Sequence, residues 1–201
     1  MVEEKFVLDT SLFLANQLRE NDDDLDDAVN RVLDIMEKSD AEFYMPASTF
    51  GELAEILRGS AEDDTADRLR GLVVRKSPPR YEVSIPGEML YKFIDDMRER
   101  VDKGLRLSEK AVRKDLDEVD EPEHKHYSKT DKVVSNLRDN YKEKMRKGTI
   151  DSKEDIDILL LAKELDAGVV TEDQGVINWC EDLGLRYVKG RNFPDYLKRN
   201  L

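Results

Sequence analysis

Cysteine is almost absent from this chain of 201 residues, and long apolar runs are missing altogether. The single cysteine, Cys180, cannot form an internal disulfide, which indicates a reducing compartment such as the cytoplasm. No run of about 18 apolar residues is present, so we expect no membrane span. The N-terminus has no basic region followed by an apolar stretch, which argues against a signal peptide. Glycine-rich phosphate loops, zinc spacings and nucleophilic Ser–His motifs are also missing.

Basic residues are outnumbered, and the net charge is −13. An acidic chain argues at first against nucleic acid, whose phosphates favour a basic surface. The acidic excess lies in residues 1–80 and 151–201, however, whereas residues 81–150 hold equal numbers of acidic and basic side chains. An acidic surface also suits a salt-rich cytoplasm. The middle of the chain is therefore where we expect any RNA contact.

Hydrophobic periodicity predicts an α/β fold with one inserted segment. We expect strands at Lys5–Leu8, Glu42–Met45, Gly168–Thr171 and Arg186–Val188. Helices are predicted at Asp22–Lys38, from about Phe50 to Leu57, and at Asp64–Val74, Ser152–Leu165, Gln174–Leu183 and Pro194–Asn200. Helices that alternate with strands through short turns indicate a parallel sheet covered by helices. The sheet domain would comprise residues 1–80 and 151–201.

The insertion, residues 81–150, is predicted to be a helical hairpin. Pro86–Leu116 and His126–Lys147 each place apolar residues at helical spacing, and an acidic, Pro-containing connector, Asp115–Glu123, separates them. Each arm would reach about 30 Å at ~1.5 Å per residue, which is too long for a simple loop of the sheet domain. We expect the hairpin to project.

Four aspartates are placed to share one edge of the predicted sheet. Asp9 ends the first strand, and Asp173 follows the Gly168–Thr171 strand by two residues. Parallel α/β sheets bind ligands beyond the carboxyl ends of their strands. Asp151 and Asp155 are four residues apart at the start of a helix, hence on one face. Such acids repel one another unless a divalent cation such as Mg²⁺ or Mn²⁺ binds them, and that cation can assist phosphodiester hydrolysis.

Each aspartate also has an ordinary structural explanation. Asp173 and Asp9 could cap helices, Asp151 could be a turn residue, and Ser152 with Asp155 resembles a capping box. In a chain with 46 acidic residues, one aspartate alone is more often structural than catalytic. It is their common placement at strand ends that favours a metal site.

Other residues carry weaker signals. Further candidates for the site are Glu52, Asp157, Thr10 and Ser11, although Glu52 suits a solvated helix face equally well and the two hydroxyls suit N-capping. His124 and His126 are two residues apart, as in some metal pairs, but they lie in the acidic connector and are more readily explained as exposed. Cys180, beside Trp179, is expected to be packed in the core.

Three segments together resemble the PIN-domain nucleases. They are Phe6–Ser11, Asp155–Ala162 and Val169–Gly175, in this order and spacing. More narrowly, the whole chain resembles the RNA-free ribonuclease P family first recognised in Aquifex and found in many archaea. The features that match are the length, the hairpin before the acidic helix, Lys103–Arg106 and Ser152–Asp157. The resemblance implies a PIN-like α/β/α sandwich with a central parallel sheet.

The same resemblance implies a function. It predicts a metal-dependent endonuclease that removes the 5′ leader from precursor tRNA without an RNA subunit, using Mg²⁺ or Mn²⁺. Asp9, Asp151, Asp155 and Asp173 would be the metal-binding acids, and the hairpin would engage the tRNA elbow. Family members assemble into dimers and larger rings, so a homo-oligomer is expected.

Positive charge on the predicted hairpin agrees with a phosphate-binding role. Basic side chains repeat along both arms, and the candidates for RNA contact are Arg98, Lys103, Arg106, Arg138, Lys142, Arg146 and Lys147. Such groups position a phosphate backbone without reading bases. The alternative is that they form solvated helix faces.

Two other functions stay open from the sequence. A toxin-type PIN ribonuclease is usually shorter and lacks the long hairpin. A non-catalytic RNA-binding scaffold would not need the complete set of four acids. Cleavage of precursor tRNA is the assay that separates these alternatives from a ribonuclease P.

Overall fold

The fold was analysed in a computed structural model, which describes residues 4–14, 25–60, 63–82, 84–115, 129–146, 150 and 152–199. Two compact units are distinguished: residues 1–84 with 150–201, and residues 85–149. The chain leaves the first unit once and returns to it once. In the described residues, no helix is both long and apolar enough to cross a membrane.

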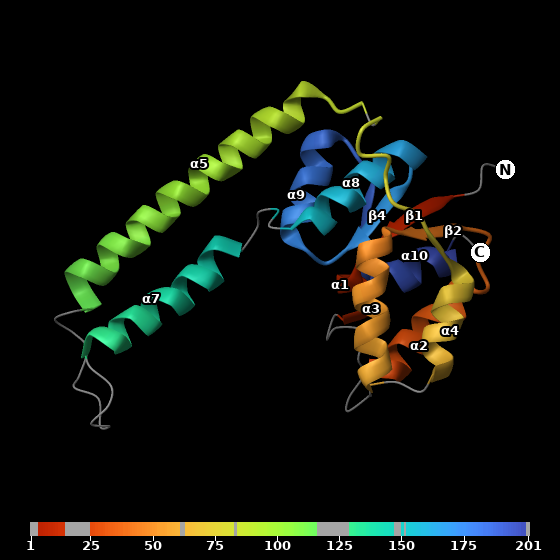
Figure 1. The fold of residues 1–201 in the computed structure, drawn as a ribbon. Coiled ribbons are helices and arrows are strands. Elements are labelled where there is room, and N and C mark those ends of the chain that lie inside the picture. Colours follow the sequence, from red (N-terminus) through yellow and green to blue (C-terminus); the bar gives the residue numbers. More distant parts are fainter. Residues whose placement is uncertain are drawn as a thin grey trace. The chain divides into compact units, whose positions relative to one another are not determined.

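A five-stranded parallel sheet forms the centre of the first unit (Figure 1). The strands lie in the order β3-β2-β1-β4-β5, and the two central ones are β1 (Lys5–Leu8) and β4 (Gly168–Thr171). Beside them lie β2 (Glu42–Met45) and β5 (Tyr187–Lys189), and β3 (Val73–Arg75) forms an edge. Val7 pairs with Tyr44 on one side and with Val169 on the other. The predicted α/β class with a parallel sheet is confirmed.

Strand β3 was missed by the sequence prediction, which continued a helix to Val74. Helix α4 ends at Leu72 (Asp63–Leu72), and Val73 begins the strand. Two β-branched valines lower helix propensity, and pairing with β2 supplies the hydrogen bonds that a continued helix would otherwise make. A three-residue strand is too short to show alternation, so tertiary pairing decided its conformation.

One face of the sheet carries the larger described core. The Phe193 ring meets two others there edge-on, with its centroid 5.2 Å from that of Phe6 and 6.2 Å from that of Phe43. The helices that contribute to this core are α1 (Thr10–Leu14), α2 (Leu25–Met36), α3 (Ala47–Ser60), α4 and α10 (Phe193–Arg199). A 3₁₀ turn, η3 (Gly190–Asn192), links β5 to α10.

Helices α8 (Lys153–Leu165) and α9 (Gln174–Leu183) complete the unit. Helix α8 packs against β1 and β4, and α9 packs against α8 and β4. Strand residues alternate between the two faces of a sheet, so Val7 and Val169 lie on the face opposite Phe6. Asp166 caps the C-terminus of α8 in the left-handed conformation (φ 51°), and β4 begins two residues later. Because this turn is short, α8 runs antiparallel to β4. The N-terminus of α8 therefore lies toward the carboxyl edge of the sheet.

The second unit consists of two helices side by side, α5 (Gly87–Lys110) and α7 (Lys129–Arg146), with a π-helical turn, η2 (Ala111–Asp115), extending α5 (Figure 1). They pack closely at Gly104, where a Cβ atom would stand 3.2 Å from the Tyr141 ring. Leu107, Ala111 and Val133 are buried. Except for Asp115, which ends η2, the predicted connector lies outside the described residues, as do His124 and His126.

Candidate active site

The carboxyl ends of β1 and β4 are joined through hydroxyl side chains. Asp9 follows β1, and its backbone N–H donates to the Val170 carbonyl at 3.0 Å. The Thr171 hydroxyl donates to Asp9 Oδ2 at 2.5 Å and accepts from the Asp173 N–H at 2.9 Å. Thr171 is fully buried. One hydroxyl therefore ties the aspartate after β1 to the aspartate after β4.

A second hydroxyl repeats this link. Ser11, in the first turn of α1, donates to Asp9 Oδ2 at 2.6 Å and accepts from the Glu172 N–H at 2.9 Å. Thr10 stands near the other oxygen, with its hydroxyl 3.3 Å from Asp9 Oδ1. Ser11 and Thr10, predicted as accessory residues, thus lie at the Asp9 carboxylate, where they orient its oxygens.

The Asp9 carboxylate is buried, and none of the described lysine or arginine side chains pairs with it. The residue is 6% exposed, and within the described part of the chain neither Asp9 nor Asp173 pairs with a lysine or arginine. Its described hydrogen-bond partners are neutral hydroxyls and a backbone amide. A buried carboxylate is normally compensated by a cation, because removing its charge from water costs several kcal/mol. This arrangement suits a carboxylate that takes a metal ion as its counter-charge.

Asp173 has a structural role as well, as the sequence had suggested. Its Oδ1 accepts from the backbone N–H groups of Gly175 at 2.6 Å and of Val176 at 3.0 Å, which makes it the N-cap of α9. Capping engages Oδ1 and sets the orientation of the carboxylate. The residue itself is exposed. Capping and metal binding are compatible, since the cap orients the group that a metal would use.

Asp155 lies in the first turn of α8, and its backbone N–H donates to the Ser152 hydroxyl at 3.0 Å. The predicted Ser152 cap is confirmed. The side chain of Asp155 is half-buried. Asp151 lies outside the described residues. Among the residues that are described, no three acidic, histidine or cysteine side chains stand close enough to hold a metal ion. The structure thus links Asp9 to Asp173 through the Thr171 hydroxyl, and the topology brings Asp155 to the same edge of the sheet.

The remaining predicted residues lie elsewhere. Glu52 is exposed on α3. Asp157 is 3% exposed within α8, and both its oxygens accept from Arg80. Of the candidates for RNA contact, Arg98, Lys103 and Arg106 are on α5 and Arg138 is on α7, with the three arginines exposed. The side chains of Lys142 and Arg146, and all of Lys147, are outside what the structure describes.

Two residues of the site were missed from the sequence. Thr171 had a detectable signal, because it is the polar end of an otherwise apolar buried strand, one residue before Glu172-Asp173. Arg80 had none, since it follows two prolines in a segment that was interpreted as a break. A buried partner 77 residues away along the chain, Asp157, cannot be inferred from local pattern.

Comparison with known proteins gives a consistent result. Residues 5–201 match the family described as PINc domain ribonuclease. The RNA-free ribonuclease P of Haloarcula marismortui is 50% identical, over all of this chain and 92% of the relative. Those of Methanothermobacter thermautotrophicus and Thermococcus onnurineus are 38% and 36% identical, over 100% and 96% of this chain and 98% and 94% of their own lengths. The predicted resemblance to PIN nucleases and to RNA-free ribonuclease P is confirmed.

Proposed function

The chain belongs to the RNA-free ribonuclease P family of PINc-domain ribonucleases, and from that membership we propose that it cuts the 5′ leader from precursor tRNA without an RNA subunit. The products would be a 3′-hydroxyl on the leader and a 5′-phosphate on the tRNA. The observation that supports this most is the buried Asp9 carboxylate, which has no described cationic side chain beside it and is joined through Thr171 to Asp173. We place the activity in the cytoplasm, as the single cysteine suggested.

The metal ligands proposed are Asp9, Asp151, Asp155 and Asp173. Carboxylate oxygens are the ligands that Mg²⁺ and Mn²⁺ prefer, and PIN nucleases generally depend on such divalent ions. When bound, the metal supplies an activated water and neutralises charge on the phosphodiester. Ser11 and Thr171 hold the Asp9 carboxylate in one orientation, and the α9 N-terminus holds Asp173. The protein's own contribution is thus to fix its carboxylates before metal and RNA arrive.

The test of this function is cleavage of a precursor tRNA with Mg²⁺ by the wild-type chain and by Asp155→Asn. We expect the variant to lose cleavage and keep its fold, since the Ser152 hydroxyl still caps α8 through the backbone N–H of residue 155. Asp166→Asn is a matched control. It removes one negative charge from the opposite end of α8, and asparagine tolerates the left-handed backbone that Asp166 adopts.

Outcomes of this assay separate the alternatives. Correct removal of the leader by the wild-type chain and by Asp166→Asn, but not by Asp155→Asn, supports the proposal. Cleavage of single-stranded RNA with equal efficiency indicates a toxin-type PIN ribonuclease. RNA binding with an uncut leader indicates a non-catalytic scaffold, and either of these results contradicts the ribonuclease P function.

The helices α5 and α7 are proposed to bind the tRNA backbone, and the tRNA elbow is the part that we expect them to contact. Arg98, Arg106 and Arg138 are exposed, and this unit is the least acidic part of the chain. Phosphate contacts of this kind release counterions, so each one steepens the salt dependence of binding by about 0.7 to 0.9 in a log–log plot. Arg98→Ala with Arg138→Ala should weaken binding and flatten that slope. An unchanged slope would exclude these two arginines from the RNA contact.

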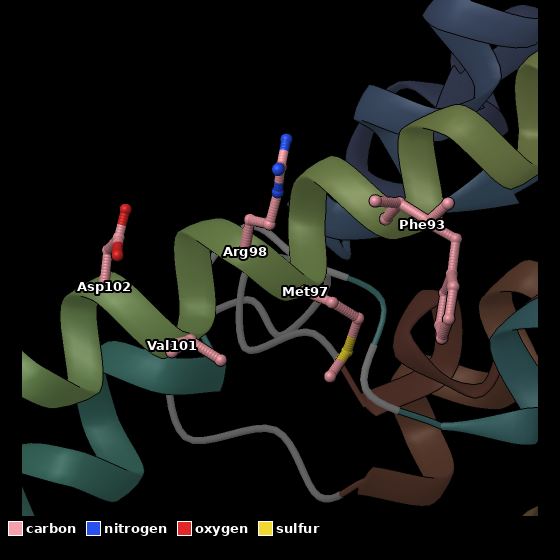
Figure 2. Close-up of a pocket in the computed structure, with 6 residues that line it drawn as sticks. Phe93, Met97, Arg98, Val101 and Asp102 are labelled. Atoms are coloured by element: carbon pink, nitrogen blue, oxygen red, sulfur yellow. The ribbon is translucent and has the colours of Figure 1, made fainter.

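Self-association is proposed through the apolar side of α5. Figure 2 shows Phe93, Met97 and Val101 extending from one side of the helix, where they line a pocket. Their exposed fractions are 50%, 41% and 66%. We propose that a second copy of this chain occupies the pocket. The related family forms homo-oligomers, and a stripe of apolar side chains can pack against the same stripe of a second copy. Light scattering tests this: Phe93→Glu with Met97→Glu should lower the mass to that of a monomer, and a monomeric wild-type chain would contradict it.

A further inference from the structure

A short segment after β3, residues 76–80, crosses the carboxyl edge of the sheet. The Lys76 N–H donates to the carbonyl of Met45, the last residue of β2, at 3.0 Å. The Ser77 hydroxyl accepts from the Ala47 N–H, the first residue of α3, at 3.4 Å. Pro78 is buried. We call residues 76–80 the strap, since they pass from the edge strand over the end of β2.

The strap is tied to α8 by two ion pairs. Lys76 Nζ stands 2.9 Å from Glu164 Oε1, near the C-terminal end of the helix. Arg80 forms an ion pair with Asp157 in the second turn of α8: the Arg80 Nε donates to Oδ1 at 3.0 Å, and the Nη2 donates to Oδ2. The two helix residues are seven positions apart, which is two turns along one face. Of the two pairs, the second involves a buried carboxylate, since the Asp157 side chain is 4% exposed and the Arg80 side chain 58%.

Both carboxylate oxygens of Asp157 are engaged by the guanidinium fork. A planar two-donor contact fixes orientation as well as charge, which a lysine in the same place would not do. Asp157 is therefore poorly placed to serve as a metal ligand. Asp155 lies two residues earlier on the helix, about 200° around its axis, and only half-buried. Asp157 is thus buried within the unit, while Asp155 lies on a different side of the helix.

The geometry points to Arg80 and Asp157 as a positioning pair: it anchors the first turns of α8 to the strap and so holds Asp155 at the carboxyl edge of the sheet. This inference rests on the proposed metal-binding role of Asp155. Without Arg80, Asp157 becomes an uncompensated buried carboxylate beside the proposed ligands. It must then turn toward water or compete with Asp155 for the cation, and both disturb the first turn of α8.

Three variants test this pair: Arg80→Met, Asp157→Asn, and the two together. Measured quantities are kcat and KM for precursor tRNA cleavage, Mn²⁺ affinity by calorimetry, and the melting temperature. Arg80→Met should lower kcat and weaken Mn²⁺ binding by about tenfold or more, with KM nearly unchanged, as is typical for residues that orient metal ligands. Asp157→Asn should lower both quantities by a smaller factor, because the anchor is weakened but no uncompensated buried charge is left behind. The double variant should recover part of the loss, up to the level of Asp157→Asn.

Lys76→Met is the matched control, since it removes a strap cation whose partner, Glu164, lies away from Asp155. We expect wild-type kcat and Mn²⁺ affinity for it. If Arg80→Met changes only the melting temperature, or if the double variant shows no recovery, the positioning role is refuted. If Asp157→Asn is as inactive as Asp155→Asn, Asp157 binds the metal itself and the inference is wrong.

Two further results keep the test decisive. Should Arg80→Met fail to fold, Arg80→Lys keeps the positive charge but loses the fork, and a partial loss of Mn²⁺ affinity is expected; full wild-type affinity would contradict the role of the fork. Should the wild-type chain bind Mn²⁺ but leave precursor tRNA uncut, the proposed function fails. The pair is then still judged by Mn²⁺ affinity, through its loss in Arg80→Met and recovery in the double variant.

Discussion

Replacing Thr171 by valine removes the hydroxyl that links Asp9 to Asp173. Valine has nearly the same shape, so the buried position stays filled, but Asp9 Oδ2 loses a donor at 2.5 Å and the Asp173 N–H loses its acceptor. A hydrogen bond to a charged group contributes about 1.5 to 3 kcal/mol. The expected loss of stability is therefore about 2 kcal/mol, or about 4 to 8 °C in melting temperature for a chain of this size.

Activity should fall as well, because the Asp9 carboxylate keeps the Ser11 hydroxyl but gains freedom to rotate. A cost of about 1.4 kcal/mol in the transition state corresponds to a tenfold lower rate. Single-turnover cleavage of precursor tRNA and thermal melting followed by circular dichroism measure the two effects. Thr171→Ser keeps the hydroxyl and should retain most of the activity, while Thr10→Val removes the weaker contact at 3.3 Å and should change little. A Thr171→Val chain as stable and active as wild type would refute this network as the device that orients Asp9.

Three further predictions concern the same unit. Asp173→Asn keeps an N-cap for α9 but removes the charge, so cleavage should be lost with little change in melting temperature; Asp173→Ala should in addition lose about 1 kcal/mol of stability. Burial raises the pKa of Cys180 from 9.0 to about 12, so the thiol should resist iodoacetamide at neutral pH until the chain is unfolded. The folded thiol holds its proton more tightly than the unfolded one. Its contribution to the free energy of unfolding is therefore fully present below pH 9.0, and denaturant titrations should show stability falling between pH 9.0 and about 12. Gly184 ends α9 with φ 65°, and Gly184→Ala should cost about 1 kcal/mol in urea unfolding through backbone strain, with Gly184→Asn costing less.

Much of the fold was accessible from the sequence because its signals are local. Lys5–Leu8, Glu42–Met45, Gly168–Thr171 and Gln174–Leu183 were predicted with the bounds that the structure has. Each is bounded by a turn or cap residue, and each strand is followed closely by a helix. Strand β3 was missed because three residues show no periodicity, and its conformation depends on pairing with β2.

Local sequence signals also predicted part of the site. Spacing along the chain placed Asp9 and Asp173 just beyond two strands, and the parallel topology then required both to lie at one edge of the sheet. The sequence pattern also gave Ser152 as the cap of α8, because capping is a contact between near neighbours. Whether Asp151 joins the set stays a prediction, as does the role of each of the four acids.

Tertiary structure alone decided which of the neighbouring polar residues act together. Asp155 and Asp157 are indistinguishable by composition, yet folding buries one against Arg80 and leaves the other half-exposed. Likewise, Thr171 became the link between two aspartates only when β1 and β4 paired. Hydrophobic periodicity and helix capping involve residues that are close together in the sequence, so the sequence alone reveals them. A buried charge finds its partner across 77 residues, and only the folded chain brings the two together.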